Sequence, residues 1–315
     1  MAIARDFLIW LSTKPALTRP IATTGMRLGF ARRFIAGETV EEALQVAQNL
    51  NVRGLLVVMN QLGEYVKSRE EVEATYASYE RLLREMGARK IVGTITVKPT
   101  QLGLELAPDL CRQLACKLAA QAQAMGTVVE IDMEHSAVAG ATIDLFEHVR
   151  SAYPNVGLAV QSYLRRTPSD LKRLEPYHPK IRLVKGAYNE PAEVAFQEKG
   201  EVDRSYLDLL GTLFANGFYP AVASHDDVMI ARARELARDS HFRPDQWEVQ
   251  MLYGIRRDLQ EQLVRDGVQM RVYVSFGTQW MPYFMRRLAE RPANVGFVLK
   301  ALLKGDRTAP GGSIR

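Results

Sequence analysis

Residues 127–163 read TVVEIDMEHSAVAGATIDLFEHVRSAYPNVGLAVQSY, and this stretch decides the fold class. It opens on a short apolar run, TVVEIDM, continues through an amphipathic stretch at 141–152, and closes on a second apolar run, VGLAVQSY. Near-continuous apolar runs of this length are typical of parallel strands that are buried on both faces. The segment therefore predicts a strand, a helix and a second, parallel strand.

The same alternation continues along the chain in both directions. Further strand-like runs are RGLLVVMN from Arg53, KIVGTITVK from Lys90, IRLVKGAY from Ile181, YPAVASH from Tyr219, WEVQMLYG from Trp247 and QMRVYVSFG from Gln269. Further helical patterns lie at 68–87, 106–126, 168–177, 205–217, 226–239, 256–267 and 280–295. Strands that are each followed by a helix predict a (β/α)8 barrel of the α/β class. An open doubly wound sheet is the alternative, but the even spacing, with no shift in composition, favours the barrel.

Capping residues set several expected helix ends. Ser68 is the expected N-cap of the helix that follows it, and Gly87 and Gly126 are expected to end helices. A helix over 39–50 opens with TVEE, which has the pattern of a capping box. A second helix is expected over 22–37. The chain is thus expected to form a helical arm over 1–50, a barrel over 51–304 and a flexible tail over 305–315.

Composition excludes several classes of protein. The 315 residues are 47% hydrophobic and 24% charged with two cysteines, which excludes a disordered chain, a collagen-like fibre and a disulfide scaffold. The apolar run FLIWL near the N-terminus is too short for a signal-peptide core or a membrane span, so we expect a cytoplasmic protein. The net charge is +5, but no basic stripe with interleaved aromatic residues occurs, so nucleic acid is not an expected partner.

Polar side chains gather at the predicted carboxyl ends of the strands, where barrel enzymes place their active sites. They are Glu64, Lys98, Asp132, Glu134, His135, Gln161, Tyr163, Arg182, Lys185, Tyr188, Ser224, His225, Asp226, Tyr253 and Tyr273. Each has an ordinary structural explanation when it is taken alone, such as a helix cap or a solvated rim residue. Together they predict a mouth with several unpaired cations and few carboxylates, which favours an anionic ligand.

The last predicted helix, 280–295, carries polar residues where a barrel helix normally has an apolar stripe. Tyr283, Arg286, Arg287 and Glu290 share one of its faces, so this helix is expected to lie over the barrel mouth. A solvated charged face is the alternative interpretation. Paired arginines suit bidentate binding of a carboxylate or phosphate.

Nucleotide-binding and hydrolase motifs such as GxGxxG, the Walker loop, HExxH and the nucleophile elbow do not occur in the sequence. Asp132, Glu134 and His135 form the nearest group to a metal site. Strand alternation sends Asp132 and Glu134 to one side, so a metal site would need help from other strands, such as from His225, and no bound metal is expected.

Several longer motifs lie along the chain. They are TQLGLEL at 100–106, VEIDME at 129–134, VQSYLRR at 160–166, LVKGAY at 183–188, ASHDD at 223–227, LYG at 252–254, RVYVSFG at 271–277 and PYFMRRLAERPAN at 282–294. Through these motifs the sequence resembles the proline dehydrogenase family, in its short bacterial monofunctional type. The matches run in family order from Glu64 to Asn294. Departures from the family pattern are Asn189, Ser224, Ser275 and Phe276.

The resemblance implies a distorted barrel that binds FAD noncovalently at its strand ends, with the last helix over the mouth. It implies hydride transfer from C5 of L-proline to flavin N5, giving 1-pyrroline-5-carboxylate. The reduced flavin would pass electrons to a membrane quinone during a transient contact at the inner membrane face. Pyrroline-5-carboxylate dehydrogenase would take the product onward to glutamate.

The resemblance also assigns roles to single residues of this chain. Asp132 and Arg182 take the catalytic roles, the first by orienting arginine and tyrosine side chains and the second by reaching the flavin N5 region. Glu64 would gate the site. Residues that would contact proline are Lys98, Arg286, Arg287, Tyr273, Tyr283, Leu252 and Tyr188. Residues that would hold the cofactor, besides Arg182, are Met133, Gln161, Lys185, Gly186, Ala187, Ser224, His225 and Glu290.

Two other classes of function compete with this one. A metal-dependent barrel lyase or isomerase would use Asp132, Glu134 and His135 on an anionic sugar or keto acid. A non-catalytic barrel would bind small carboxylates as a sensor. Bound flavin in the purified protein would support the proline dehydrogenase interpretation and exclude both of these alternatives.

Overall fold

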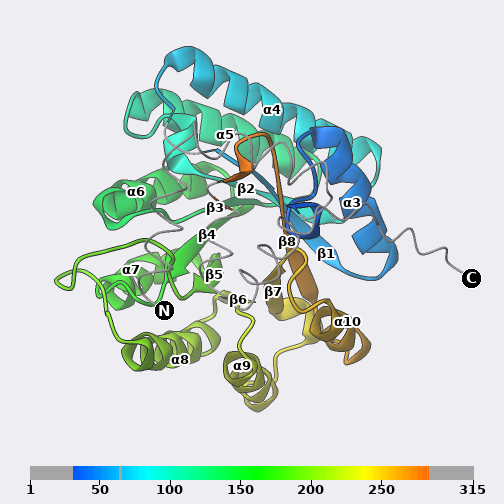
Figure 1. The fold of residues 1–315 in the computed structure, drawn as a ribbon. Coiled ribbons are helices and arrows are strands. Elements are labelled where there is room, and N and C mark those ends of the chain that lie inside the picture. The colour runs from blue at the N-terminus through cyan, green and yellow to red at the C-terminus, as the bar shows by residue number, and fades with distance from the viewer. Residues whose placement is uncertain (1–30, 64–65, 282, 284–315) are drawn as a thin grey trace, which may run out of the picture.

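The computed structural model describes residues 31–63, 66–281 and 283, and these form a closed barrel of parallel strands. Figure 1 shows the strands at the centre of a ring of helices. The strands are β1 (Leu56–Gln61), β2 (Gly93–Val97), β3 (Val129–Ile131), β4 (Val156–Gln161), β5 (Lys180–Val184), β6 (Tyr219–Ala223), β7 (Glu248–Leu252) and β8 (Met270–Phe276). All eight overlap the strand-like runs, so the predicted barrel is confirmed.

The barrel closes between its first and last strands. β1 pairs with β8 in parallel from Leu56 opposite Arg271 to Gln61 opposite Phe276. Every strand pairs with its neighbour in sequence order, so each crossover carries a helix to the outside. The carboxyl ends of all the strands therefore meet at one end of the barrel.

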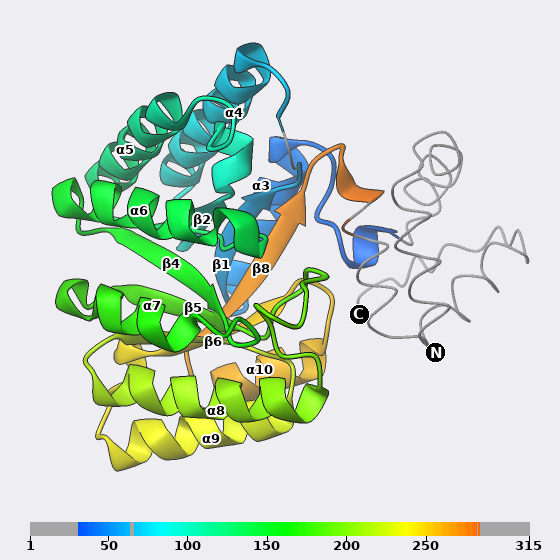
Figure 2. The same cartoon turned by 90° about the vertical axis from the view of Figure 1, so that its left-hand side faces the viewer.

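Helices cover the outside of the sheet in chain order, and the turned view of Figure 2 shows them on both sides of the strands. They are α3 (Val40–Val52), α4 (Arg69–Ala88), α5 (Pro108–Ala124), α6 (Ser136–Ala152), α7 (Thr167–Leu174), α8 (Lys199–Ala215), α9 (Asp227–Asp239) and α10 (Arg257–Arg265). α3 precedes the barrel and packs beside β1 and β8. Within the described residues, no helix is long and apolar enough to cross a bilayer.

Most of the expected helix caps are present. Glu42 at the start of α3 forms a capping box with Thr39, and the Ser68 hydroxyl accepts a hydrogen bond from the Glu71 amide at the start of α4. Gly126 lies just past α5 with a φ of +67°, as expected for a helix end. Gly87, however, does not end its helix, because α4 continues to Ala88.

The helix expected over 22–37 lies mostly outside the described residues. Within them, Ala31–Arg33 forms a single 3-10 turn, and the chain from Ile35 to Gly37 is irregular, so the prediction is wrong for that end. Gly37 has a φ of +142°, and a Cβ at this position would overlap the Glu42 side chain, so a larger residue would displace it.

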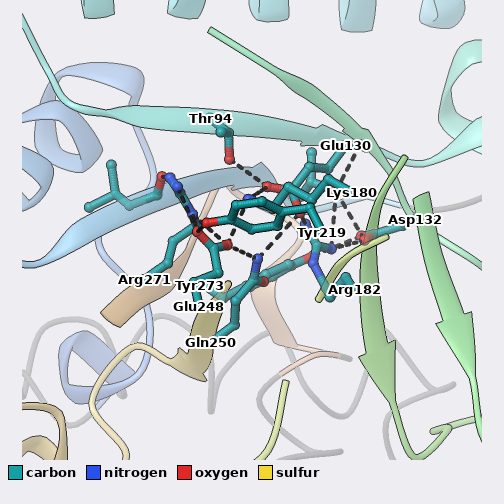
Figure 3. Close-up of polar contacts among 12 residues, drawn as sticks. Thr94, Glu130, Asp132, Lys180, Arg182, Tyr219, Glu248, Gln250, Arg271 and Tyr273 are labelled. Atoms are coloured by element: carbon teal, nitrogen blue, oxygen red, sulfur yellow. Dashed lines mark hydrogen bonds and ion pairs between the residues drawn. The ribbon is translucent and has the colours of Figure 1, made fainter. Parts of the chain in front are cut away.

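The inside of the barrel is polar, which the apolar appearance of the strand runs did not predict. The residues that contact one another there include Thr94, Glu130, Lys180, Arg182, Glu248, Gln250 and Arg271, as Figure 3 shows. Glu130 on β3 bonds Gln250 on β7, and two strands that are not neighbours can meet only across the interior. Apolar residues between these positions, such as Val249 and Val272, face the surrounding helices and form the main core. Barrels usually fill this space with branched apolar side chains.

Candidate active site

A cavity of about 700 Å³ opens at the carboxyl ends of the strands, within the size range of small-molecule and cofactor sites. Its lining includes all fourteen of the predicted site residues that the structure describes. They are Lys98, Asp132, Met133, Gln161, Arg182, Lys185, Gly186, Ala187, Tyr188, Ser224, His225, Leu252, Tyr273 and Tyr283.

The other predicted site residues are Glu64, Arg286, Arg287 and Glu290, and they lie outside the described residues, as does the rest of the helix expected over 280–295. The chain turns helical at Trp280, and Tyr283 is still described. Tyr283 is 8% exposed and contributes to the cavity wall.

Asp132, just past the end of β3, is the meeting point of the cavity's polar residues. Its Oδ2 accepts a hydrogen bond from the Tyr273 hydroxyl at 2.8 Å and lies 3.2 Å from Lys98 Nζ. Its Oδ1 accepts from the Thr96 hydroxyl at 3.0 Å and pairs with Arg182 Nη1. Burial pushes the pKa of Asp132 upward, but the charges of Lys98 and Arg182 outweigh it and hold that pKa below its usual value. Asp132 therefore stays ionised and ties one lysine, one arginine and one tyrosine together.

Arg182 on β5 lies between two carboxylates at the floor of the cavity. Its Nη1 pairs with Asp132, and its Nη2 lies 2.5 Å from Glu130 Oε2 (Figure 3). The guanidinium carbon is 5.2 Å from the centre of the Tyr273 ring. Burial opposes the charge of Arg182, but Glu130 and Asp132 more than compensate, so its pKa lies above the usual value. Among the described residues, its buried Nε has no hydrogen-bond partner.

Lys98, Arg182 and Lys185, which are described cations at the mouth, are paired, and this corrects the expectation of unpaired ones. Lys98 pairs with Asp132, and Arg182 pairs with Asp132 and Glu130. Lys185 Nζ lies 2.6 Å from an oxygen of Asp203 and 3.0 Å from one of Asp226. These carboxylates come from other elements, so the local sequence around each cation gives no sign of them.

The loop after β5 brings backbone close to the cavity at Gly186. Gly186 has a φ of +122°, and a Cβ there would lie 2.3 Å from a ring atom of Tyr163. Any larger residue would displace either the Tyr163 ring or the loop. Two residues on, the Tyr188 ring meets the His135 ring edge to face at 6.3 Å between centroids.

His225 and Ser224 are held by the backbone beside them. The Leu252 amide donates to His225 Nε2 at 3.0 Å, so the neutral imidazole carries its hydrogen on Nδ1. The Ser224 hydroxyl accepts a hydrogen bond from the Asp226 amide at 3.1 Å. Both side chains therefore have fixed orientations just past the end of β6, and His225 is bonded there to the last residue of β7.

The acidic cluster considered as a metal site is divided. Asp132 faces the cavity, whereas Glu134 accepts hydrogen bonds from the Thr100 amide at 2.9 Å and from the Thr100 hydroxyl at 2.6 Å. Gln161 donates to the Glu134 carbonyl rather than to a side chain. Across residues 31–63, 66–281 and 283, no three His, Cys, Asp or Glu side chains are grouped as metal ligands.

Sequence reasoning missed several cavity residues, including Asn60, Lys199 and Gln250. Gln250 lies two residues before Leu252 on β7, so strand alternation places both on one face. Strand alternation could therefore have identified Gln250, whereas a choice of the last residues of each strand leaves it out. Asn60 Oδ1 and Gln250 Oε1 are buried and have no hydrogen-bond partner among the described residues.

Comparison with known proteins decides the family. A sequence model described as proline dehydrogenase matches residues 43–300. Proline dehydrogenase 1 of Bacillus subtilis is 37% identical over 300 residues, which are 95% of this chain and 99% of that protein. Proline dehydrogenase of Deinococcus radiodurans is 36% identical over 280 residues, which are 87% and 90% of the two chains. The chain belongs to the proline dehydrogenase family.

Larger relatives contain the same unit. The bifunctional protein PutA of Escherichia coli is 29% identical over 333 residues, which are 90% of this chain and 25% of that protein. The crystal structure of PutA from Bdellovibrio bacteriovorus inactivated by N-propargylglycine superposes with a TM-score of 0.79 at 24% identity, covering 89% of this chain and 34% of that one. This chain thus spans about a third of that larger protein, and the structural likeness concerns the fold. Membership of the proline dehydrogenase family makes the chain an oxidoreductase of proline catabolism.

Proposed function

We propose that this proline dehydrogenase uses noncovalently bound FAD to oxidise L-proline to 1-pyrroline-5-carboxylate and passes the electrons to a membrane quinone. The observation that carries the proposal is the floor of the cavity. There, Asp132 and Glu130 hold the Arg182 guanidinium, and its buried Nε has no hydrogen-bond partner among the described residues. A buried donor without a partner is costly unless a bound molecule accepts its hydrogen bond.

The residues around the cavity fit a flavin. Arg182 Nε offers a donor, Gln250 Oε1 offers an acceptor, and Gly186 lets the backbone approach closely. Lys185 supplies a cation for a pyrophosphate, although the same ammonium group also pairs with Asp203 and Asp226. Residues proposed to hold the cofactor are Met133, Gln161, Arg182, Lys185, Gly186, Ala187, Ser224, His225 and Glu290. When bound, FAD supplies an acceptor, N5, for the hydride that leaves proline C5.

Cations and aromatic rings suit proline as the substrate. Lys98, with Arg286 and Arg287, is proposed to bind the proline carboxylate, which fixes the ring without a general base at that end. Burial lowers the pKa of Lys98, but the adjacent Asp132 more than compensates, so the amine stays protonated. As the hydride leaves C5, the lone pair of the ring nitrogen forms the C=N bond, so the amine must be neutral at that moment.

Apolar and aromatic side chains would keep water away from the reacting carbon. Tyr188, Leu252, Tyr273 and Tyr283 line the cavity in the structure and are proposed to wall the pyrrolidine ring. Asp132 is proposed to keep Tyr273 and Lys98 in position, as their hydrogen bonds indicate. Glu64 is proposed to pair with an arginine of the clamp and to gate the cavity.

The proposal also includes an electron acceptor and an enzyme that consumes the product. A membrane quinone would reoxidise the enzyme during a transient contact with the cytoplasmic face of the inner membrane. Pyrroline-5-carboxylate dehydrogenase would consume the product, and PutA relatives are named as bifunctional proteins.

The visible absorbance of the purified protein tests the proposal. We expect flavin bands, release of FAD on denaturation, and proline-dependent reduction of a soluble quinone. A purified protein that contains a divalent metal and no flavin, and that gains no proline oxidation when FAD is added, would contradict the proposal. That result would favour the metal-dependent alternative.

A further inference from the structure

A line of alternating charges fills the barrel below the cavity (Figure 3). Arg271 on β8 forms a double contact with Glu248 on β7, at 2.9 Å for both Nε and Nη2. Lys180 Nζ bridges Glu248 at 2.6 Å and Glu130 at 3.1 Å. Glu130 then holds Arg182, which pairs with Asp132 in the cavity.

Glu130 contacts residues on three other strands of the barrel. Its two oxygens accept hydrogen bonds from Thr94 on β2 at 2.7 Å, from Arg182 on β5 at 2.5 Å and from Gln250 on β7 at 3.4 Å. It is 1% exposed and does not line the cavity. Burial raises its pKa, but Arg182, Lys180 and Arg271 lower it further than burial raises it, so the carboxylate is ionised.

The stability of the fold does not require a charge at this position. Replacing a buried ion pair by well-packed apolar residues is often neutral or stabilising, and branched apolar residues occupy the interior of most barrels. The carboxylate of Glu130 instead fixes the orientation of the Arg182 guanidinium. It holds Nη2 while Asp132 holds Nη1, which leaves Nε as the one guanidinium nitrogen without a hydrogen-bond partner among the described residues.

We propose that Glu130 is a positioning residue, which acts through Arg182 to present the Nε hydrogen to the cofactor in the cavity. The inference rests on the proposed function, because it assigns flavin as the group that receives that hydrogen bond. It assigns a role in flavin reduction to a residue that does not line the cavity. It also predicts that substitutions can separate the effect of the Glu130 charge from its effect on the orientation of Arg182.

The substitution Glu130→Gln has two effects on the reduction of the flavin by proline, one through charge and one through the orientation of Arg182, and they oppose each other. Removing a negative charge near the flavin stabilises the reduced, more negative ring, so the midpoint potential rises and reduction becomes more favourable. Loss of the clamp lets the guanidinium turn, which slows hydride transfer. We therefore expect a higher potential together with a rate of flavin reduction by proline that is at least about tenfold lower, at an unchanged Kd for proline.

Two companion variants isolate the two effects. Glu130→Gln combined with Lys180→Met removes one carboxylate and one cation, so the potential should return toward that of wild type while the rate stays low. Glu248→Gln removes the same charge from a residue that does not contact Arg182, so the potential should rise and the rate should stay within about threefold of wild type. The double variant also carries the test if Glu130→Gln alone fails to fold.

The measurements are the midpoint potential, the flavin content and the stopped-flow rate of reduction, all on the FAD-loaded enzyme. Reduction at or above the wild-type rate in both Glu130 variants would overturn the inference. Glu248→Gln slowing as much as Glu130→Gln would also overturn it, because the effect would then not depend on contact with Arg182. A wild-type enzyme whose bound flavin proline does not reduce would overturn the proposed function instead.

Discussion

Tyr273 donates its hydroxyl hydrogen to Asp132 at 2.8 Å, joining the end of β3 to β8 at the cavity. The same Asp132 oxygen lies 3.2 Å from Lys98 Nζ. Burial, and next the charge of Asp132, raises the pKa of Tyr273 well above its ordinary value. The hydroxyl therefore remains a donor at working pH, and one carboxylate fixes both a ring and a cation around the proposed substrate.

Asp132→Asn should lower kcat/KM for proline by about 10- to 100-fold, because a neutral amide cannot balance Lys98 and Arg182 together. Tyr273→Phe removes one hydrogen bond and keeps the ring, so it should cost about fivefold. Steady-state kinetics normalised to flavin content provide the measurement. An Asp132→Asn enzyme with wild-type kcat/KM would show that Asp132 does not organise the site.

Lys98→Met should raise KM for proline more than it lowers kcat. Losing a charge-assisted hydrogen bond to a buried carboxylate costs about 1.5–3 kcal/mol, which is about 10- to 150-fold in kcat/KM. Lys172→Met removes an exposed lysine from α7 and serves as the matched control. If Lys98→Met and Lys172→Met give the same KM, Lys98 does not bind the proline carboxylate.

Tyr283→Ser should change substrate preference. Tyr283 is buried on the cavity wall, and its ring is expected to press on C4 of proline, where hydroxyproline carries its hydroxyl. A hydroxyl that loses water against a ring and gains no partner costs about 1–3 kcal/mol. The ratio of proline to 4-hydroxyproline efficiency should therefore fall severalfold in Tyr283→Ser and remain unchanged in Tyr283→Phe. An unchanged ratio in Tyr283→Ser would show that Tyr283 does not discriminate against hydroxyproline, and Tyr273 or Leu252 would then be the next residue to test.

Acid should destabilise the fold through the carboxylates inside the barrel. Burial raises the pKa values of Glu130 and Glu248, but their cationic neighbours outweigh it and hold both pKa values below the ordinary 4.5. Below about pH 4.5 the unfolded chain therefore binds protons that the folded chain does not, and the free energy of unfolding falls as the pH falls. Each carboxylate contributes a slope of about 1.4 kcal/mol per pH unit in that window.

Urea unfolding between about pH 5 and about pH 3.5 checks this prediction. Glu248→Gln should show a shallower decline than wild type, because one titrating carboxylate has been removed. Identical slopes in the two proteins would show that Glu248 does not contribute to the acid sensitivity.

The barrel could be predicted from the sequence because strand and helix patterns alternate at even spacing. One further rule, that strand ends converge at one rim, predicted part of the cavity lining, such as Lys98 and Asp132. Met133, Gly186 and Ala187 were identified only through the family resemblance. Gln250 and Glu130 were missed because they lie one layer below that rim. Alternation along WEVQM and VVEID marks them as sharing a face with Leu252 and Asp132.

The pairing of charges could not be predicted from the sequence. Lys185 meets Asp203 of α8 and Asp226 beyond β6, and Arg182 meets Glu130 of β3. These partners are separated by 18, 41 and 52 positions, and only the closed barrel brings them together. The helix end at Gly87 failed for a local reason, because α4 continues to Ala88 before the chain turns at Lys90 with a φ of +54°.

Anaerobic addition of L-proline to the purified enzyme, followed by visible absorbance, shows whether proline reduces a bound flavin. We expect the flavin bands to bleach at a rate that saturates with proline, 1-pyrroline-5-carboxylate to form in equal amount, and a quinone to restore the bands. Bound flavin that keeps its full absorbance at saturating proline would contradict the proposed function.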